Sequence, residues 1–421
     1  MRSGLSYKSF LRSGGRLLAA ASVLGVSLLI LSCGASNTIG FLYVTSNLQN
    51  PGQINAYKID SESGGIFQLA DSPYLSGGRN PVYEVASPNG LYLYVANHDD
   101  NTIVQFDIGT DGKLYPISTI NTPGTEPVAL AINAAGNALY VLDYYAPAAP
   151  GQPSYTDLNP GPGALIAYPI NSNGSLGAPI AAGAANYFPV QCFPSDLVVT
   201  PDGNFVYVTN TNAVVVTTSP PVTGTVPVHP ASCPVYGTVS GFSVTSSSVT
   251  EVGSPFSTGA GSEPSGIVAD PGSGAVYVTD SHLNQLDTFS IQSGGALSLA
   301  ATIGTGVMPM GGTVVSGTGG KFLYITNYTD GTVSIYSLSS GLPSLVGTGN
   351  SGASGPLCVL ADPTTQRFLY IADYTGGTIG GVELNPSTGT LIVNQGSPYP
   401  TSGQPTCVAA ITHVGGNKNG L

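Results

Sequence analysis

Four side chains that could carry out chemistry lie between positions 79 and 126 of this 421-residue chain. They are Arg79, Glu84, His98 and Glu126. A histidine or a carboxylate can act as a general base toward water, and an arginine can donate hydrogen bonds to a developing oxyanion. These residues are therefore the candidate catalytic group for an acyl hydrolysis. The alternative is that they form structural ion pairs, and the sequence leaves both interpretations open.

A bound ligand would meet a slightly different set of polar side chains. The candidate ligand-binding residues are Arg79, His98, Asp99, Asp100 and His282. No two of the four histidines are close in sequence, and no cysteine pair has the spacing of a metal site, so we expect no metal. The chain also lacks a Walker A sequence and a G-x-S-x-G nucleophile elbow, and we expect no cofactor.

A tetrad of the type Tyr-Val-Thr-Asn recurs along the chain and sets its organisation. The copies begin at Tyr43, Tyr94, Tyr140, Tyr207, Tyr277, Tyr324 and Tyr370. Successive tyrosines are 51, 46, 67, 70, 47 and 46 residues apart. A repeat of about 40 to 50 residues made of short strands is typical of β-propeller blades. We expect the tyrosines to pack between blades and the last residue of each tetrad to fix the turn that follows.

The fifth repeat shows the four strands of one blade most clearly. Its strands A to D are expected at 264–269, 275–279, 285–291 and 297–303, separated by turns rich in glycine. In such a meander the B–C and D–A connections emerge on one face, called here the loop face. The A–B and C–D turns emerge on the opposite turn face.

The two ends of the chain predict how the ring closes. The first repeat, beginning at Phe41, has no strand A, whereas a surplus strand A follows Pro405. We therefore expect the C-terminal strand to join the first blade, with Val408 beside Tyr43, because closure removes exposed sheet edges. The predicted fold is all-β: a seven-bladed propeller of four-stranded antiparallel blades over residues 41–413, followed by a tail at 414–421.

Length variation is concentrated on the loop face. Two insertions, at 144–163 and 211–236, both fall between strands B and C. The candidate residues lie on the same face, where function is most often found. Acidic side chains follow strand B repeatedly, and we expect solvated turn acids there, with a Ca²⁺ site as the alternative: Asp99, Asp100, Asp143, Asp280 and Asp373.

The N-terminal residues have the features of a targeting segment. Basic residues precede an apolar run over 17–31 that is short for a membrane span, so residues 1–32 are expected to be a signal peptide. The segment Ile30-Leu31-Ser32-Cys33-Gly34 resembles a bacterial lipobox. That resemblance implies lipidation at Cys33, a tether over 33–40, and a membrane-anchored protein of the cell envelope. The alternative is an ordinary signal peptide with an incidental cysteine.

Export to an oxidising compartment would permit disulfides among the other four cysteines. Cys192 precedes strand A of the fourth blade and Cys233 lies in the insertion of that blade. We predict a Cys192–Cys233 bridge that pins the insertion. Cys358 and Cys407 are expected to be buried free thiols, because strands A of neighbouring blades are not hydrogen-bonded partners.

The charge of the chain limits its partners. Residues after 32 contain six basic and 22 acidic side chains, a net charge of −16, and such a surface repels nucleic acid. We expect a monomer held at the membrane through Cys33.

The tetrads resemble the YVTN repeat, and residues 38–413 are similar to the seven-bladed lactonase-type propellers. That family includes 6-phosphogluconolactonase-like enzymes and many exported proteins without established activity. Our primary hypothesis is an envelope module that binds a ligand or protein through the loop face. The alternative is a lactone hydrolase that activates water near His98, Glu84 or Glu126, although a single arginine would make a poor phosphate site.

Overall fold

The computed structural model of the protein describes residues 37–47, 50–157, 159–211, 233, 236–272, 274–339, 341–352 and 354–413. The chain divides into two compact units, Met1–Thr38 and Ile39–Leu421, and the second contains the blades. Cys33, the segment 1–32 that we expect to be a signal peptide, the tail at 414–421 and most of the second insertion lie outside the described residues.

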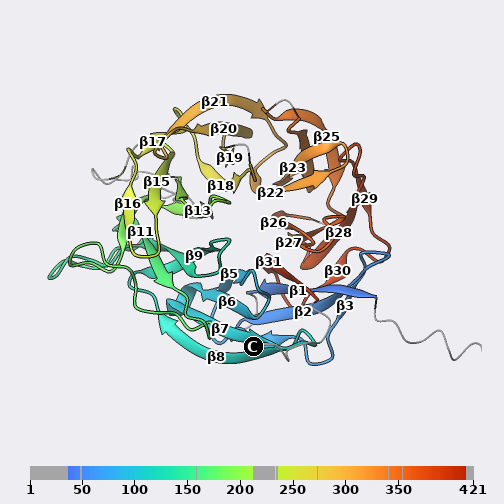
Figure 1. Ribbon diagram of the computed structural model, residues 1–421, viewed down its shortest axis with the longest axis horizontal. Helices are drawn as coiled ribbons and strands as arrows, with labels where there is room; N and C mark the ends of the chain where they lie inside the picture. Colours follow the sequence, from blue (N-terminus) through green and yellow to red (C-terminus); the bar gives the residue numbers. More distant parts are fainter. Residues whose placement is uncertain are drawn as a thin grey trace, which may run out of the picture. The chain divides into compact units, whose positions relative to one another are not determined.

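Seven antiparallel sheets surround a central channel, each with strand A innermost (Figure 1). The A strands are β5 (Pro81–Ala86), β9 (Thr125–Ile132), β13 (Pro194–Val199), β18 (Pro264–Ala269), β22 (Pro309–Gly317), β26 (Pro356–Ala361) and β31 (Pro405–Thr412). The B strands, which hold the tetrads, are β1 (Thr38–Ser46), β6 (Tyr92–Asn97), β10 (Ala138–Tyr145), β14 (Phe205–Asn210), β19 (Ala275–Asp280), β23 (Gly320–Asn327) and β27 (Phe368–Asp373).

The outer half of each blade completes the meander. The C strands are β2 (Gln53–Asp60), β7 (Thr102–Ile108), β11 (Pro162–Pro169), β15 (Thr238–Val244), β20 (Gln285–Ile291), β24 (Thr332–Ser337) and β28 (Thr378–Leu384). The D strands are β3 (Ile66–Gln68) with β4 (Tyr74–Leu75), β8 (Leu114–Asn121), β12 (Phe188–Cys192), β16 (Val249–Glu251) with β17 (Phe256–Ser257), β21 (Leu297–Gly304), β25 (Ser344–Asn350), and β29 (Leu391–Val393) with β30 (Tyr399–Pro400). The predicted seven-bladed propeller is confirmed, and the strands of the fifth blade agree with the prediction to within one residue.

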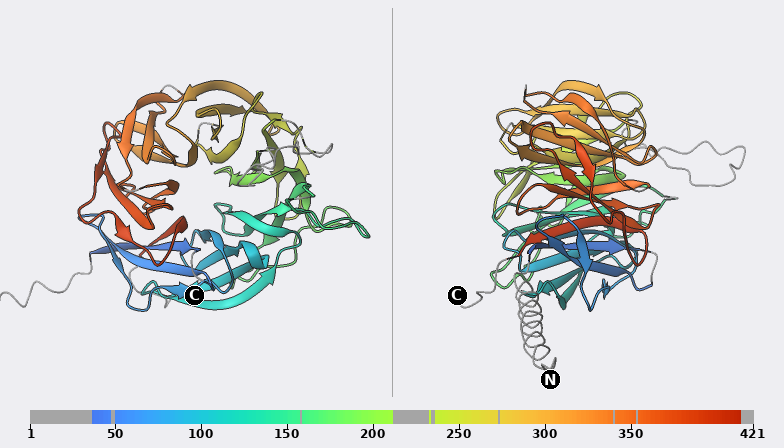
Figure 2. Two further views of the ribbon diagram at one scale, coloured as in Figure 1. Left: turned by 180° about the vertical axis from the view of Figure 1, so that it is seen from behind. Right: turned by 90° about the vertical axis from the view of Figure 1, so that its right-hand side faces the viewer.

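The first blade contains the closure predicted from the chain ends. The C-terminal strand β31 pairs antiparallel with β1, and the view from behind shows the same unbroken ring (Figure 2). Val408 lies opposite Val44, and Tyr43 lies opposite Ala409, so the register is one residue from the predicted one. Pairing with β31 covers the edge of β1 that would otherwise have no partner strand.

The hydrophobic core lies between blades. Strand β14 is buried along Val206–Asn210, because both faces of its sheet are covered by neighbouring blades. Its Tyr207 packs with Val276 and Val278 of the next blade. A strand buried on both faces is expected to be a continuous apolar run, which explains why the tetrads do not alternate. Burial of each such side chain contributes about 1.5–3 kcal/mol.

Most tetrad tyrosines also form a polar contact across the blade junction. Five hydroxyls donate to a glycine carbonyl in the C–D turn of the next blade, at 2.6–2.9 Å: Tyr43 to Gly112, Tyr94 to Gly174, Tyr207 to Gly295, Tyr324 to Gly389 and Tyr370 to Gly64. Gly64 has φ +62°, and a Cβ there would overlap the ring of Phe368. The prediction that these tyrosines pack between blades is confirmed.

The side chain of the last tetrad residue accepts a hydrogen bond from the D–A connection that passes over the loop-face end of strand B. Asp143 accepts a hydrogen bond from the Gly124 amide at 2.8 Å, and Asn327 accepts one from Gly306 at 3.1 Å. The expectation of solvated turn acids agrees with Asp99, which is exposed, and with Asp100, which is partly exposed. It is wrong for the three acids that end tetrads, which are fully buried: Asp143, Asp280 and Asp373. Burial raises the pKa of Asp143 to about 8 and that of Asp373 to about 8.

Candidate functional site

The candidate residues of the second blade gather on the loop face, where the second blade meets the third. His98, Asp99 and Asp100 form a short 3₁₀ helix, η1 (His98–Asp100), directly after strand β6. Arg79 lies just before strand β5, and Glu126 is the second residue of β9 in the third blade. The structure thus brings five predicted residues together from three connections, and we call this group the mouth cluster: Arg79, His98, Asp99, Asp100 and Glu126.

Arg79 is fixed by Asp100. Its Nε donates to Asp100 Oδ1 at 2.7 Å and its Nη2 lies 2.6 Å from the same oxygen. The Arg79 backbone amide donates to Asp100 Oδ2 at 2.7 Å, and Nη2 also donates to the Asp99 carbonyl at 3.0 Å. The side-chain hydrogen bond from Arg79 lowers the pKa of Asp100, which therefore stays ionised at neutral pH.

His98 lies between two carboxylates. Its Nδ1 is 2.9 Å from Asp99 Oδ1, and its Nε2 is 3.9 Å from Glu126 Oε2. When Nδ1 donates to Asp99, the lone pair is on Nε2, the arrangement of a general base with an orienting acid. The imidazole is 27% exposed, so water can reach it.

Glu126 adopts an unusual backbone conformation. Its φ is +59°, and its amide donates to Asn101 Oδ1 at 2.7 Å. Burial raises the pKa of the Glu126 carboxyl, the His98 ring opposes that effect, and the negative charge of Asp157 adds to it.

The first insertion covers one side of the mouth cluster. Asp157 accepts a hydrogen bond from the Tyr145 hydroxyl at 2.8 Å. Tyr144 packs on Tyr145 and on Phe193, with ring centroids 4.8 and 5.7 Å apart. Burial first, and then the charges of Asp157 and Glu126, raise the pKa of the Tyr144 hydroxyl. The sequence analysis missed Tyr144 and Asp157, whose only signal is their position in the insertion.

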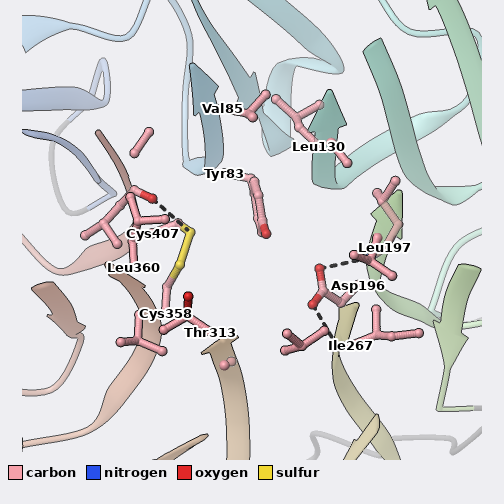
Figure 3. A pocket seen from close by; sticks show the side chains of 18 of the residues that line it. Tyr83, Val85, Leu130, Asp196, Leu197, Ile267, Thr313, Cys358, Leu360 and Cys407 are labelled. Carbon is pink, nitrogen blue, oxygen red and sulfur yellow. Dashed lines mark hydrogen bonds between the residues drawn. A yellow bond between two sulfur atoms is a disulfide. The ribbon is translucent and has the colours of Figure 1, made fainter. Parts of the chain in front are cut away.

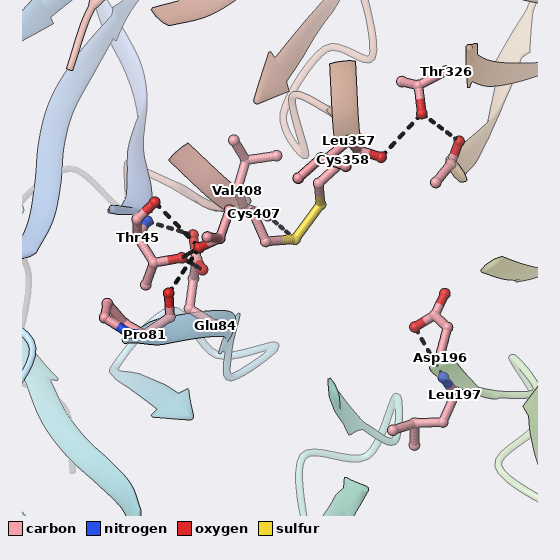
Figure 4. The surroundings of a disulfide bond; sticks show 12 residues. Thr45, Pro81, Glu84, Asp196, Leu197, Thr326, Leu357, Cys358, Cys407 and Val408 are labelled. Carbon is pink, nitrogen blue, oxygen red and sulfur yellow. Dashed lines mark hydrogen bonds between the residues drawn. A yellow bond between two sulfur atoms is a disulfide. The ribbon is translucent and has the colours of Figure 1, made fainter. Parts of the chain in front are cut away.

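Glu84 and His282 do not join the mouth cluster. Glu84 is 2% exposed and accepts hydrogen bonds from the amide and hydroxyl of Thr45 in the first blade (Figure 4). Its partner Thr45 belongs to the first blade and lies 39 residues away in sequence, so Glu84 is held away from the mouth cluster. Desolvation raises the pKa of Glu84 to about 8. His282 lies in the fifth blade, at the equivalent B–C connection.

The central channel holds a second group of polar side chains that the sequence analysis missed. The channel encloses about 460 Å³ and is lined by A strands from all seven blades. The hydroxyl of Tyr83 extends into this space on the side facing Asp196 (Figure 3). Asp196 accepts backbone hydrogen bonds from Leu197 at 2.9 Å and from Ile267 at 3.1 Å, so it links blades four and five. Desolvation raises its pKa to about 7.

Two disulfides are present among the described residues. Cys192–Cys233 joins the predicted pair, with Cα atoms 5.5 Å apart. The expectation that Cys358 and Cys407 are free thiols is wrong, because they form the second disulfide (Figure 4). Their strands are not hydrogen-bonded to each other, but A strands converge at the channel. The Cα atoms are therefore 5.0 Å apart, which is within the range for a disulfide.

Within the described ranges, no three His, Cys, Asp or Glu side chains form a group suited to a metal ion. The same ranges contain no helix with the length and apolar character of a membrane span.

Comparisons with known proteins agree with this architecture. The family model described as "Lactonase, 7-bladed beta-propeller" matches residues 84–145. A 6-phosphogluconolactonase of Formosa agariphila is 34% identical over 86 residues, 20% of this chain and 23% of the relative. A 6-phosphogluconolactonase of Xenorhabdus nematophila is 29% identical over 132 residues, 31% of this chain and 34% of the relative. The matches thus span about a quarter and a third of these relatives.

Solved structures share the whole fold. The periplasmic gluconolactonase of Pseudomonas aeruginosa superposes with a TM-score of 0.67 at 17% identity, covering 89% of this chain and 99% of that one. A protein from Lactobacillus plantarum gives a TM-score of 0.66 at 16% identity, covering 89% and 99%. The two disulfides and the periplasmic neighbour are compatible with export.

These matches correct the primary hypothesis of a binding module without catalysis. Both curated relatives are named as lactone-hydrolysing enzymes, and the matched family model is that of lactonases. The family match also includes the segment from Glu84 to Tyr145, which carries most of the mouth cluster. By its repeat and its fold the chain is a seven-bladed β-propeller, and part of it is similar in sequence to lactonase-type propellers.

Proposed function

We propose that the protein is a lactone hydrolase whose reaction takes place at the mouth cluster. The observation that carries this proposal is the position of His98, whose Nδ1 lies 2.9 Å from Asp99 and whose side chain is 27% exposed. The partial matches to 6-phosphogluconolactonases support the reaction class.

In the proposed mechanism, His98 Nε2 takes a proton from water as the water oxygen attacks the lactone carbonyl carbon. Asp99 keeps the proton on Nδ1, and Glu126, 3.9 Å from Nε2, stabilises the imidazolium that forms. The tetrahedral oxyanion would accept hydrogen bonds from Arg79, whose contacts with Asp99 and Asp100 use Nε and Nη2. Collapse breaks the ring C–O bond, and His98 returns its proton to the ring oxygen, which gives a hydroxy acid.

The proposal extends to location. We propose an exported domain with a signal peptide at 1–32 and a lipid on Cys33 that anchors it at the cell envelope. Both disulfides support an oxidising compartment. Mass spectrometry of the mature protein should find an acylated N-terminal Cys33, and an unmodified cysteine would contradict the anchor.

Activity on a panel of δ- and γ-lactones, corrected for spontaneous hydrolysis, tests the reaction. We expect His98→Ala to lower kcat/KM by about 10²–10⁴-fold, the usual contribution of a general base. His282→Ala is the matched control, because His282 lies in the equivalent connection of the fifth blade, and it should retain the wild-type rate. Wild-type kcat/KM in the His98→Ala variant would refute the proposal.

A further inference from the structure

Basic side chains are scarce at the mouth cluster. Among the described residues, Arg79 is the basic side chain on the loop face. Lys113 follows a C–D turn and pairs with Asp71 at 2.6 Å. Lys321 and Arg367 precede or begin strands B on the turn face, where they pair with Asp270 and Glu383. A phosphoryl group is normally bound by several cationic donors, and here a substrate would meet one.

That one guanidinium is already paired. Asp100 contacts both Nε and Nη2 of Arg79 and also accepts its backbone amide. Arg79 remains 52% exposed at its side chain, so it can still donate a hydrogen bond to a substrate oxygen. Its positive charge is largely offset by the carboxylate in contact with it.

Carboxylates surround the remaining space. Asp99 lies against His98, Glu126 lies on the other side of the ring, and Asp157 is held beside them by Tyr145. With Asp100, four carboxyl groups accompany one arginine. A phosphate dianion would be repelled here, whereas hydroxyl groups would find hydrogen-bond acceptors.

We infer that the mouth cluster takes neutral, hydroxyl-rich lactones and discriminates against their phosphorylated forms. This inference rests on the proposed function, since it assigns the substrate class of the same site. Carboxylate oxygens accept hydrogen bonds from sugar hydroxyls, so a cluster of acidic side chains suits a hydroxyl-rich ligand. The selectivity therefore comes from an excess of acceptors over cations.

The experiment compares glucono-δ-lactone with its 6-phosphate at 10 mM ionic strength. We expect kcat/KM for the neutral lactone to be at least tenfold higher. Raising the ionic strength to 200 mM should lower the ratio of kcat/KM for the neutral lactone to kcat/KM for the 6-phosphate, because the screening length falls from about 30 Å to less than 10 Å. Asp100→Asn and Asp157→Asn should each lower this ratio as well. Asp111→Asn, an exposed aspartate in a C–D turn, should leave the ratio unchanged. A preference for the phosphorylated lactone, or a ratio insensitive to both loop-face variants, would overturn the inference.

A binding measurement separates this inference from the proposed function. Gluconolactam, a neutral analogue that resists hydrolysis, and its 6-phosphate are titrated into the wild-type protein by calorimetry. Tighter binding of the neutral lactam together with no lactone hydrolysis would refute the reaction and support the substrate class. Tighter binding of the phosphorylated lactam, or no binding of either, would overturn the substrate class whatever the rate of hydrolysis.

Discussion

The mouth of blades two and three has a structural equivalent at the mouth of blades five and six. In the first, Asn101 has φ +56° and accepts the Glu126 amide at 2.7 Å. In the second, Asn284 has φ +55° and accepts the Met308 amide at 2.7 Å. Glu126 and Met308 both have φ +59°. The two backbones follow the same path.

The side chains at the two mouths differ in their charge. The first mouth presents His98, Asp99 and Glu126, whereas the second presents Leu283, Val307 and Met308, which are 38–44% exposed, with His282 in the same connection but no carboxylate at the position of Glu126. A left-handed backbone at a residue other than glycine often marks a functional site. Here the same conformation occurs with an apolar residue, so it belongs to the scaffold. The evidence for chemistry lies in the ionisable side chains of the first mouth.

The largest difference expected between the two mouths is in their response to pH. Asp143 binds the Gly124 amide below the first mouth, and Asn327 binds the Gly306 amide below the second. The pKa of Asp143 is about 8 in the folded protein, against 3.8 for an exposed aspartate. Between pH 4 and 8 the folded protein keeps a proton that the unfolded chain has released. The free energy of unfolding therefore falls as pH rises through this window, by up to about 5 kcal/mol.

Asp143→Asn should remove this contribution, because an amide cannot ionise and three other tetrads already end in asparagine. Urea denaturation at intervals from pH 5 to 9 measures the slope of stability against pH. We expect a flatter slope and a variant that is more stable than wild type at pH 9. Asp111→Asn serves as the exposed control. An unchanged slope in Asp143→Asn would show that Asp143 is ionised in the folded protein.

The next effect concerns the scaffold that both mouths share. The Cys358–Cys407 disulfide links the seventh blade to the closing strand β31 and spans 49 residues of sequence. Its replacement by two serines should lower the free energy of unfolding by about 4 kcal/mol in the chain-entropy model. Lactone hydrolysis below the melting temperature should not change. Loss of activity in a folded double variant would mean that the channel takes part in the reaction.

The smallest expected effect tests the shared backbone directly. Asn101→Ala and Asn284→Ala each remove one hydrogen bond to a backbone amide and place alanine at a positive φ. Both should lose about 1–3 kcal/mol of stability, measured by thermal and urea unfolding. Only Asn101→Ala should also reduce hydrolysis, since it displaces Glu126. Equal losses of activity in the two variants would remove the functional distinction between the mouths.

Much of the fold was predictable because each blade but the first is formed by one continuous segment of the chain with the same sequence pattern. Tetrad spacing predicted seven blades, and the missing strand before Phe41 predicted closure by β31. The same regularity placed Arg79, His98 and Glu126 on one face. The contact between Glu84 and Thr45 could not be predicted, because the two residues belong to different blades and meet only when the blades pack together.

Residues far apart in sequence account for the other errors. The Cys358–Cys407 disulfide and the Tyr83–Asp196 side of the channel depend on how closely A strands approach the axis. The tetrad aspartates were expected in water, but the preceding D–A connection covers them, as Gly124 covers Asp143. The sequence pattern of a single blade predicts neither how closely the A strands approach one another nor which connection buries a tetrad aspartate.

The amino-acid sequence predicts the strands, their number and the partner of the last strand, because apolar runs and turn residues within each blade specify them. Which polar groups meet on the loop face, and which ones lose their contact with water, depends on how the blades pack. Strand formation depends on neighbours in sequence, whereas charge pairing and desolvation depend on neighbours in space contributed by other blades.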